Sequence, residues 1–189
     1  SAAGPRRRAL WLLLPVAMAT TSGVLPGFLI ASQAVQLGRD LDITTFGVGA
    51  CVASAWAVGS ALSTRLGRLS EQLGGNRGLR VAALVSMLSM LWLAVLARSL
   101  ATVVVGAAIG GVANSLAQPS ANLLVARSLP LHRHGLAFGV KQGAIPVATM
   151  LGGLAVPLIT LEFGWRVTFL VGAAFALAAA LSVPPGDAA

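Results

Sequence analysis

Six long apolar runs divide the chain, and short polar segments separate them. A helix needs about 20 mostly apolar residues to cross the hydrocarbon core of a bilayer, and each run is close to or above that length. The pattern therefore predicts an all-α, polytopic membrane protein in which residues 1–189 form a single six-helix transmembrane bundle. The predicted spans are about 9–34, 45–64, 79–97, 100–126, 135–161 and 167–183.

Composition and charge give these spans an orientation. The chain is 57% hydrophobic and carries a net charge of +8. A cytoplasmic N-terminus places nine arginines on the cytoplasmic side: Arg6, Arg7, Arg8, Arg65, Arg68, Arg77, Arg80, Arg127 and Arg133. The outer segments hold three arginines and three of the five acidic residues. Basic residues concentrate in cytoplasmic loops, so both termini are predicted to be cytoplasmic. The net positive charge is then explained by arginines in the cytoplasmic segments, which face anionic lipid headgroups, and the lipid bilayer is the predicted partner. We predict no nucleic-acid binding.

Two short matches suggest an internal repeat. Gly23-Val24 of the first span recurs as Gly111-Val112, and Phe46-Gly47-Val48 recurs as Phe138-Gly139-Val140, at offsets of 88 and 92 residues. Copies of three spans each would have opposite orientations, so the chain would contain two three-helix inverted repeats. Short matches also arise by chance in a chain rich in Gly and Val, and both interpretations remain open.

Amide side chains form a polar stripe in the fourth span. Asn114, Gln118 and Asn122 are spaced by four residues and therefore share one helix face. Such a stripe can line a substrate pathway, or it can form hydrogen bonds between helices. The first span adds Thr21 and Gln33 as candidate pathway residues.

Lys141 is the one lysine of the chain and the one charge well inside a span. It lies roughly 10 Å deep at 1.5 Å per helical residue, and Gln142 is its neighbour. Its side chain can snorkel back to the cytoplasmic interface. Alternatively, it is the counter-charge for an anionic substrate or for a carboxylate elsewhere. Both interpretations stay open, and the second makes an anionic small molecule a candidate substrate.

Two tryptophans and three prolines within the spans are assigned structural roles. Trp56 and Trp92 lie deep in their spans and are assigned to packing. Prolines cannot donate a backbone hydrogen bond, so those inside spans predict helix kinks. The predicted kinks are at Pro26, Pro119 and Pro146.

Nothing in the sequence indicates an enzyme. His132 and His134 lie in a basic loop rather than opposite a buried serine, and no metal-ligand cluster is visible. We therefore predict no catalytic residue, no metal and no cofactor.

Six spans, the segment from Gly67 to Gly74 and the Gly164-Trp165-Arg166 motif together resemble the N-terminal half of a major facilitator superfamily transporter. That family's signature between spans two and three is Gly-x-Leu-x-Asp-basic-x-Gly, and Glu71 stands where aspartate is usual. The resemblance implies a gating loop that includes Gly67, Leu69, Glu71, Gly74 and Arg77.

The resemblance also implies a function. It predicts a transporter that moves a small solute across the bacterial inner membrane by alternating access. A second six-helix half, in the same chain or as a second copy in a homodimer, would complete the pathway. The alternative is a half-size or truncated six-span membrane protein with a structural or interaction role and no transport of its own.

Overall fold

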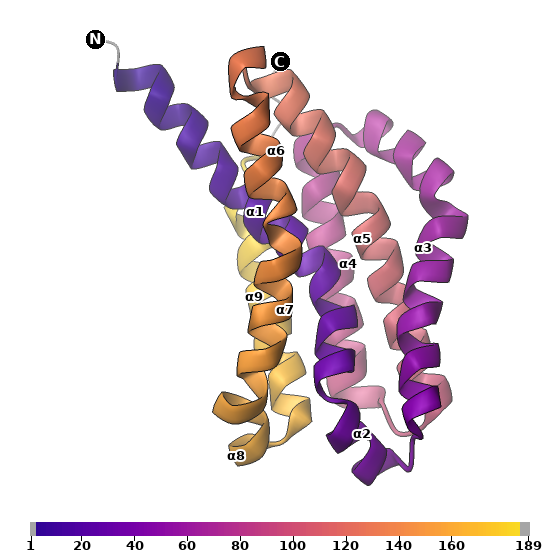
Figure 1. The fold of residues 1–189 in the computed structure, drawn as a ribbon. Coiled ribbons are helices and arrows are strands. Elements are labelled where there is room, and N and C mark those ends of the chain that lie inside the picture. The colour runs from indigo at the N-terminus through magenta and orange to yellow at the C-terminus, as the bar shows by residue number, and fades with distance from the viewer. Residues whose placement is uncertain (1–2, 186–189) are drawn as a thin grey trace.

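The protein is almost entirely α-helical, as the apolar runs predict. The computed structural model describes the backbone of residues 3–185 and the side chains of residues 13–185. The α-helices are α1 (Ala3–Ser32), α2 (Ala34–Leu41), α3 (Thr45–Leu73), α4 (Gly75–Leu96), α5 (Leu100–Ser128), α6 (His134–Gln142), α7 (Ala144–Ala155), α8 (Leu161–Phe163) and α9 (Trp165–Ser182). Helices α1, α3, α4, α5 and α9, together with the α6–α8 stretch, are long and apolar enough to cross a membrane (Figure 1). The all-α, six-span prediction is confirmed.

The second span continues as a helix through the segment predicted to be a loop. Helix α3 ends at Leu73, and only Gly74 separates it from α4, so the helix extends beyond the predicted span end at about 64. Residues 65–73 contain no proline and are rich in Leu, Arg, Glu and Gln, which favour helix. The polar residues of this segment are expected to end the membrane-spanning part, but they do not end the helix. Gly74 stops α3 because its φ of 79° and ψ of 163° are essentially restricted to glycine.

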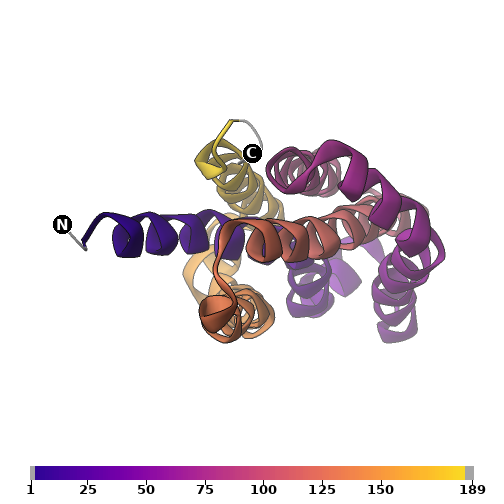
Figure 2. The same cartoon turned by 90° about the horizontal axis from the view of Figure 1, so that it is seen from above.

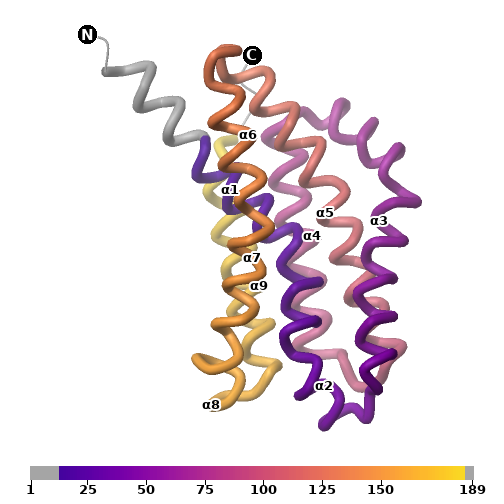
Figure 3. Tube along the Cα trace, in the orientation of Figure 1, coloured from indigo at the N-terminus to yellow at the C-terminus, as the bar shows by residue number. Residues whose placement is uncertain are grey.

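The fifth span is segmented rather than continuous. A 3₁₀ turn precedes α6, and a π-helical turn over Val156–Thr160 joins α7 to α8. Helix α7 continues from α6 along the same span (Figure 3). The two helices meet at Gly143, three residues before Pro146. Because Pro146 has no N–H, the carbonyl of Gln142 loses its helical partner, and the interruption falls there. Helices α1 and α5, by contrast, continue through Pro26 and Pro119.

The remaining span ends lie close to their predicted positions. Helix α1 ends at Ser32, and Gln33 separates it from the short α2. Helix α9 ends at Ser182, shortly before Pro184, because proline cannot continue a helix. The N-terminal arginines used for the orientation lie outside the residues whose side chains are described.

Helix α1 occupies the centre of the bundle. Its span is 72% buried and contacts α4, α5, α7 and α9, whereas the spans of α3 and of the α6–α8 stretch are each 28% buried. Helix α3 lies at the edge of the bundle and packs mainly on α5 (Figure 2). Glycines bring α3 and α5 together: a Cβ added at Gly111 would overlap the carbonyl oxygen of Ala55. Small residues thus set the close approach of these two helices.

Charge is distributed unequally between the two ends of the bundle. Helices α2 and α8 and the turn from α4 to α5 lie at one end, and the connections α3–α4 and α5–α6 lie at the other (Figure 1). Among the described side chains, the α3–α4 end carries six arginines and one carboxylate. The α2 end carries three arginines and three carboxylates. The fold therefore places at one end the six described arginines of the nine that the sequence assigns to one side of the membrane.

Two arginines join α4 and α9 at opposite ends. The Arg80 guanidinium donates to the carbonyl oxygen of Val183 at 3.0 Å. Arg166 donates to the carbonyl oxygens of Ala94 and Ala97, at 2.8 Å each. Each arginine thus satisfies carbonyls at the C-terminal end of the neighbouring helix, where a cation is electrostatically favoured.

The helix starts of α4 and α9 support the repeat interpretation. Gly164 precedes α9 with a φ of 84° and a ψ of 158°, nearly the conformation of Gly74 before α4. The two glycines are 90 residues apart, between the offsets of 88 and 92 in the sequence matches. A glycine with nearly the same backbone conformation therefore precedes the third spanning helix of each half of the chain.

Replacing Arg166 with methionine is expected to lower the unfolding temperature of the protein in detergent. The substitution removes two charge-assisted hydrogen bonds, each worth about 1.5–3 kcal/mol. Thermal unfolding of the purified protein measures the effect. Arg98→Met is the matched control, because Arg98 lies at the same end of the bundle and is exposed. Equal losses in the two variants would contradict a specific role for Arg166.

Candidate functional site

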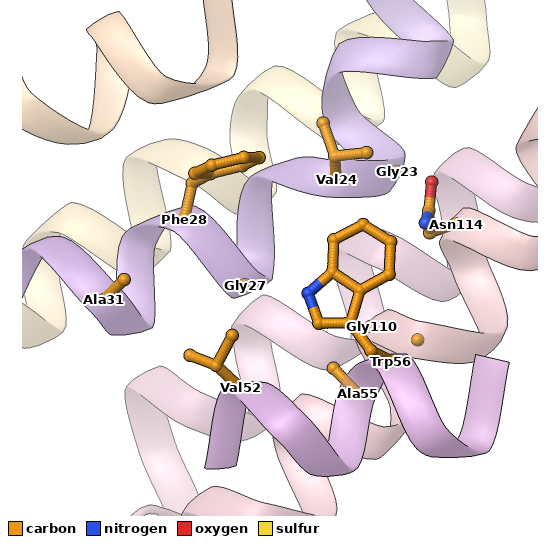
Figure 4. Close-up of a pocket in the computed structure, with 11 residues that line it drawn as sticks. Gly23, Val24, Gly27, Phe28, Ala31, Val52, Ala55, Trp56, Gly110 and Asn114 are labelled. Carbon is orange, nitrogen blue, oxygen red and sulfur yellow. The ribbon is translucent and has the colours of Figure 1, made fainter. Parts of the chain in front are cut away.

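A pocket opens on the face formed by α1, α3 and α5 (Figure 4). It is mainly apolar and lies within membrane-spanning segments, and Asn114 is its one amide side chain. Its lining residues are Gly23, Val24, Gly27, Phe28 and Ala31 from α1, Val52, Ala55 and Trp56 from α3, and Gly110, Gly111 and Asn114 from α5. Helices from both halves of the chain therefore contribute to one concave surface.

Glycines shape this pocket. A Cβ added at Gly27 would meet no atom within 4 Å, so this position faces open space. A Cβ added at Gly23 would lie 3.0 Å from the Cβ of Ala117 on α5. The absence of a side chain at Gly27 keeps the cavity open, and the small residues around Gly23 hold α1 against α5.

Trp56 and Phe28 supply the aromatic surface of the pocket. The side chain of Trp56 is 54% exposed and lines the cavity (Figure 4), so its assignment to packing is wrong. Trp92, by contrast, donates its indole N–H to the carbonyl oxygen of Thr102 at 2.9 Å, in keeping with a structural role. The sequence could not separate the two tryptophans, since both lie deep in apolar helices.

The polar stripe of α5 forms two separate hydrogen-bonded pairs. Gln118 Nε2 donates to Asn114 Oδ1 at 3.3 Å, within the helix. Lys141 Nζ of α6 donates to Asn122 Oδ1 at 2.8 Å, between helices. Of the stripe residues, only Asn114 lines the pocket, while Asn122 is exposed on the bundle surface. The stripe thus extends from the pocket to the lysine.

The other candidate pathway residues lie away from this pocket. Thr21 is 3% exposed and borders a different groove, against α6 and α7. Gln33 is fully buried at the break between α1 and α2, where its Nε2 lies 3.4 Å from Ser32 Oγ. Gln142 is exposed at the end of α6. The structure therefore does not bring these three residues together with Asn114.

The proposed gating residues are distributed over a helix–glycine–helix junction. Gly67, Leu69 and Glu71 lie in the last turns of α3, and Arg77 lies in the first turn of α4. Glu71 and Arg77 are both exposed at the arginine-rich end of the bundle. Glu71 is therefore accessible to a neighbouring protein unit on that side of the membrane.

The chemistry of the described residues suits binding. The described residues contain no group of three or more His, Cys, Asp or Glu side chains that could hold a metal ion. A ring nitrogen of His134 lies 2.9 Å from the carbonyl oxygen of Leu129, a contact that orders the α5–α6 connection. The pocket offers apolar contact, an indole and one amide, which together can select a small solute by shape and hydrogen bonding.

The sequence also matches a known protein family. The sequence model of the Major Facilitator Superfamily matches residues 5–186, nearly the whole chain. A comparison with curated proteins gives no match.

Proposed function

Because the chain belongs to the major facilitator superfamily, we propose that it moves a small solute across the membrane by alternating access. The α1–α3–α5 pocket would form this chain's part of the solute path. The observation that carries the proposal is an open, partly aromatic cavity with an amide, located within membrane-spanning helices. Polar groups are costly at that depth and tend to mark substrate paths. Members of the family are transporters rather than enzymes, and we propose no catalytic role.

A second six-helix unit would complete the path. In this proposal it faces the α1–α3–α5 surface, either as another part of the same polypeptide or as a second copy of this chain. The exposed Glu71 would contact that unit when the path opens outward. Two units moving about a solute held between them would give each side of the membrane access in turn.

Transport is tested with the purified protein reconstituted into lipid vesicles. Solutes of different charge and size are presented outside, and their uptake is compared with that of protein-free vesicles. Saturable uptake of at least one solute supports the proposal. If every solute enters both vesicle types at the same rate, a six-span structural or interaction role is the better assignment.

We also propose that both termini lie in the cytoplasm of a bacterial cell and that the protein resides in the inner membrane. The support is the excess of arginines at the α3–α4 end of the bundle. In a Cys51→Ala background, we expect a cysteine at position 98 to react with an impermeant maleimide on intact cells. A cysteine at position 77 should react only after lysis. The reverse labelling pattern would invert the topology.

A further inference from the structure

Lys141 is a buried cation that no carboxylate of the described residues neutralises. Its side chain is 6% exposed, and Asn122 is the hydrogen-bond partner that the described part of the chain gives it. The four carboxylates of residues 13–185 all lie in or beside the terminal turns of helices, outside the middle of the spans. An ammonium in a membrane-spanning segment is costly unless an anion or several acceptors compensate it.

The hydrogen bond to Asn122 fixes which groups remain for a ligand. A lysine ammonium has three donors and no acceptor, so the Asn122 side chain must turn its oxygen toward Lys141. Its two amide N–H donors then point elsewhere, and Asn122 is exposed on the bundle surface. The pair therefore offers two remaining donors from the ammonium and two from the amide, with its acceptor oxygen already engaged.

A site of this composition selects oxyanions. A carboxylate or phosphate oxygen can accept several hydrogen bonds, and an ionised acceptor makes them shorter and stronger. A cationic solute would meet the ammonium charge, and a neutral one would leave that charge uncompensated. Asn122 also lies two turns from Asn114 on α5, roughly 12 Å along the helix from the pocket at 1.5 Å per residue.

We infer that Lys141 and Asn122 bind the anionic oxygen group of the transported solute. This inference rests on the proposed transport function and assigns the solute a class: an organic anion, whose apolar part faces the α1–α3–α5 pocket. Lys141 supplies the charge. Asn122 positions the ammonium and contributes amide donors.

The single lysine gives a direct test of this site. Reductive methylation of the purified full chain in a neutral detergent labels Lys141, and peptide mass spectrometry separates it from the N-terminal amine. We expect benzoate to slow methylation at least threefold at equal ionic strength. Benzyl alcohol, a neutral compound of similar size, should have no effect. Equal rates with benzoate, benzyl alcohol and buffer would overturn the inference.

Asn122→Asp keeps the shape of the side chain and adds a built-in counter-charge. In this variant, we expect slow methylation of Lys141 without any ligand and no further effect of benzoate. Arg127→Met, which removes a nearby exposed arginine on α5, should retain the benzoate effect. Full benzoate protection in Asn122→Asp would contradict the assignment, as would loss of protection in Arg127→Met.

Two further measurements distinguish a lipid headgroup from a solute as the ligand, and failure of this inference from failure of the transport proposal. If phosphatidylglycerol protects Lys141 and benzoate does not, a lipid headgroup is the ligand and the solute assignment is wrong. Benzoate protection without uptake of any solute would keep the anion site but overturn transport. Uptake of solutes without protection of Lys141 would keep transport and overturn this inference alone.

Discussion

Replacing Gly111 with alanine is expected to lower the free energy of unfolding by about 3 kcal/mol, the upper end of the range for overpacked cores. The added Cβ would overlap the carbonyl oxygen of Ala55 and lie 2.8 Å from its carbonyl carbon. Both atoms belong to the backbone of α3, so no side-chain rotation relieves the clash. Helices α3 and α5 would have to separate along their contact.

The control for this prediction is Gly49→Ala, in α3, the helix that carries Ala55. A Cβ at Gly49 would meet nothing within 4 Å, so no clash arises there. Alanine is a better helix former than glycine by about 1 kcal/mol, and the control should be neutral or slightly stabilising. Unfolding in a denaturing detergent measures both variants. Equal stability of the two would show that the α3–α5 contact does not depend on glycine.

Replacing Gly27 with leucine is expected to reduce solute uptake at least tenfold while the protein still folds. Gly27 lines the pocket, and the space beyond it is open. A leucine side chain would project between Phe28 of α1 and Trp56 of α3 and occupy the volume that a solute needs (Figure 4). Folding should be preserved because an added Cβ meets no atom within 4 Å and leucine is a better helix former than glycine.

Gly153→Leu is the matched control for the pocket. Gly153 of α7 is exposed, does not line the pocket and would place an added Cβ in open space. Uptake by vesicles containing equal amounts of folded protein distinguishes the variants. If Gly27→Leu transports as well as Gly153→Leu, the solute path does not pass through the α1–α3–α5 pocket.

Part of the candidate site was predictable from sequence. Asn114, Gln118 and Asn122 stand out as amides inside an apolar run, and Lys141 stands out as a charge within a span. The pairing of Lys141 with Asn122 was not predictable, because it depends on how α6 lies against α5. Trp56 and Gly27 were missed, since an aromatic or a glycine in an apolar helix carries no signal of facing a cavity.

The sequence by itself determined the number of spans, the alternation of charge between the two ends and the family. The number of spans and the charge difference depend on transfer from water to lipid and on the sign of charge, which residues carry individually. The family follows from the sequence match over residues 5–186. Only the tertiary structure decided which helix faces are buried, that α3 extends to Leu73 and that α1 lies at the centre. The physical reason is that lipid is as apolar as the interior of the bundle. Hydrophobicity therefore identifies a membrane-spanning helix but does not distinguish its buried face from its lipid-facing face. The packing of the helices against one another determines which face is buried.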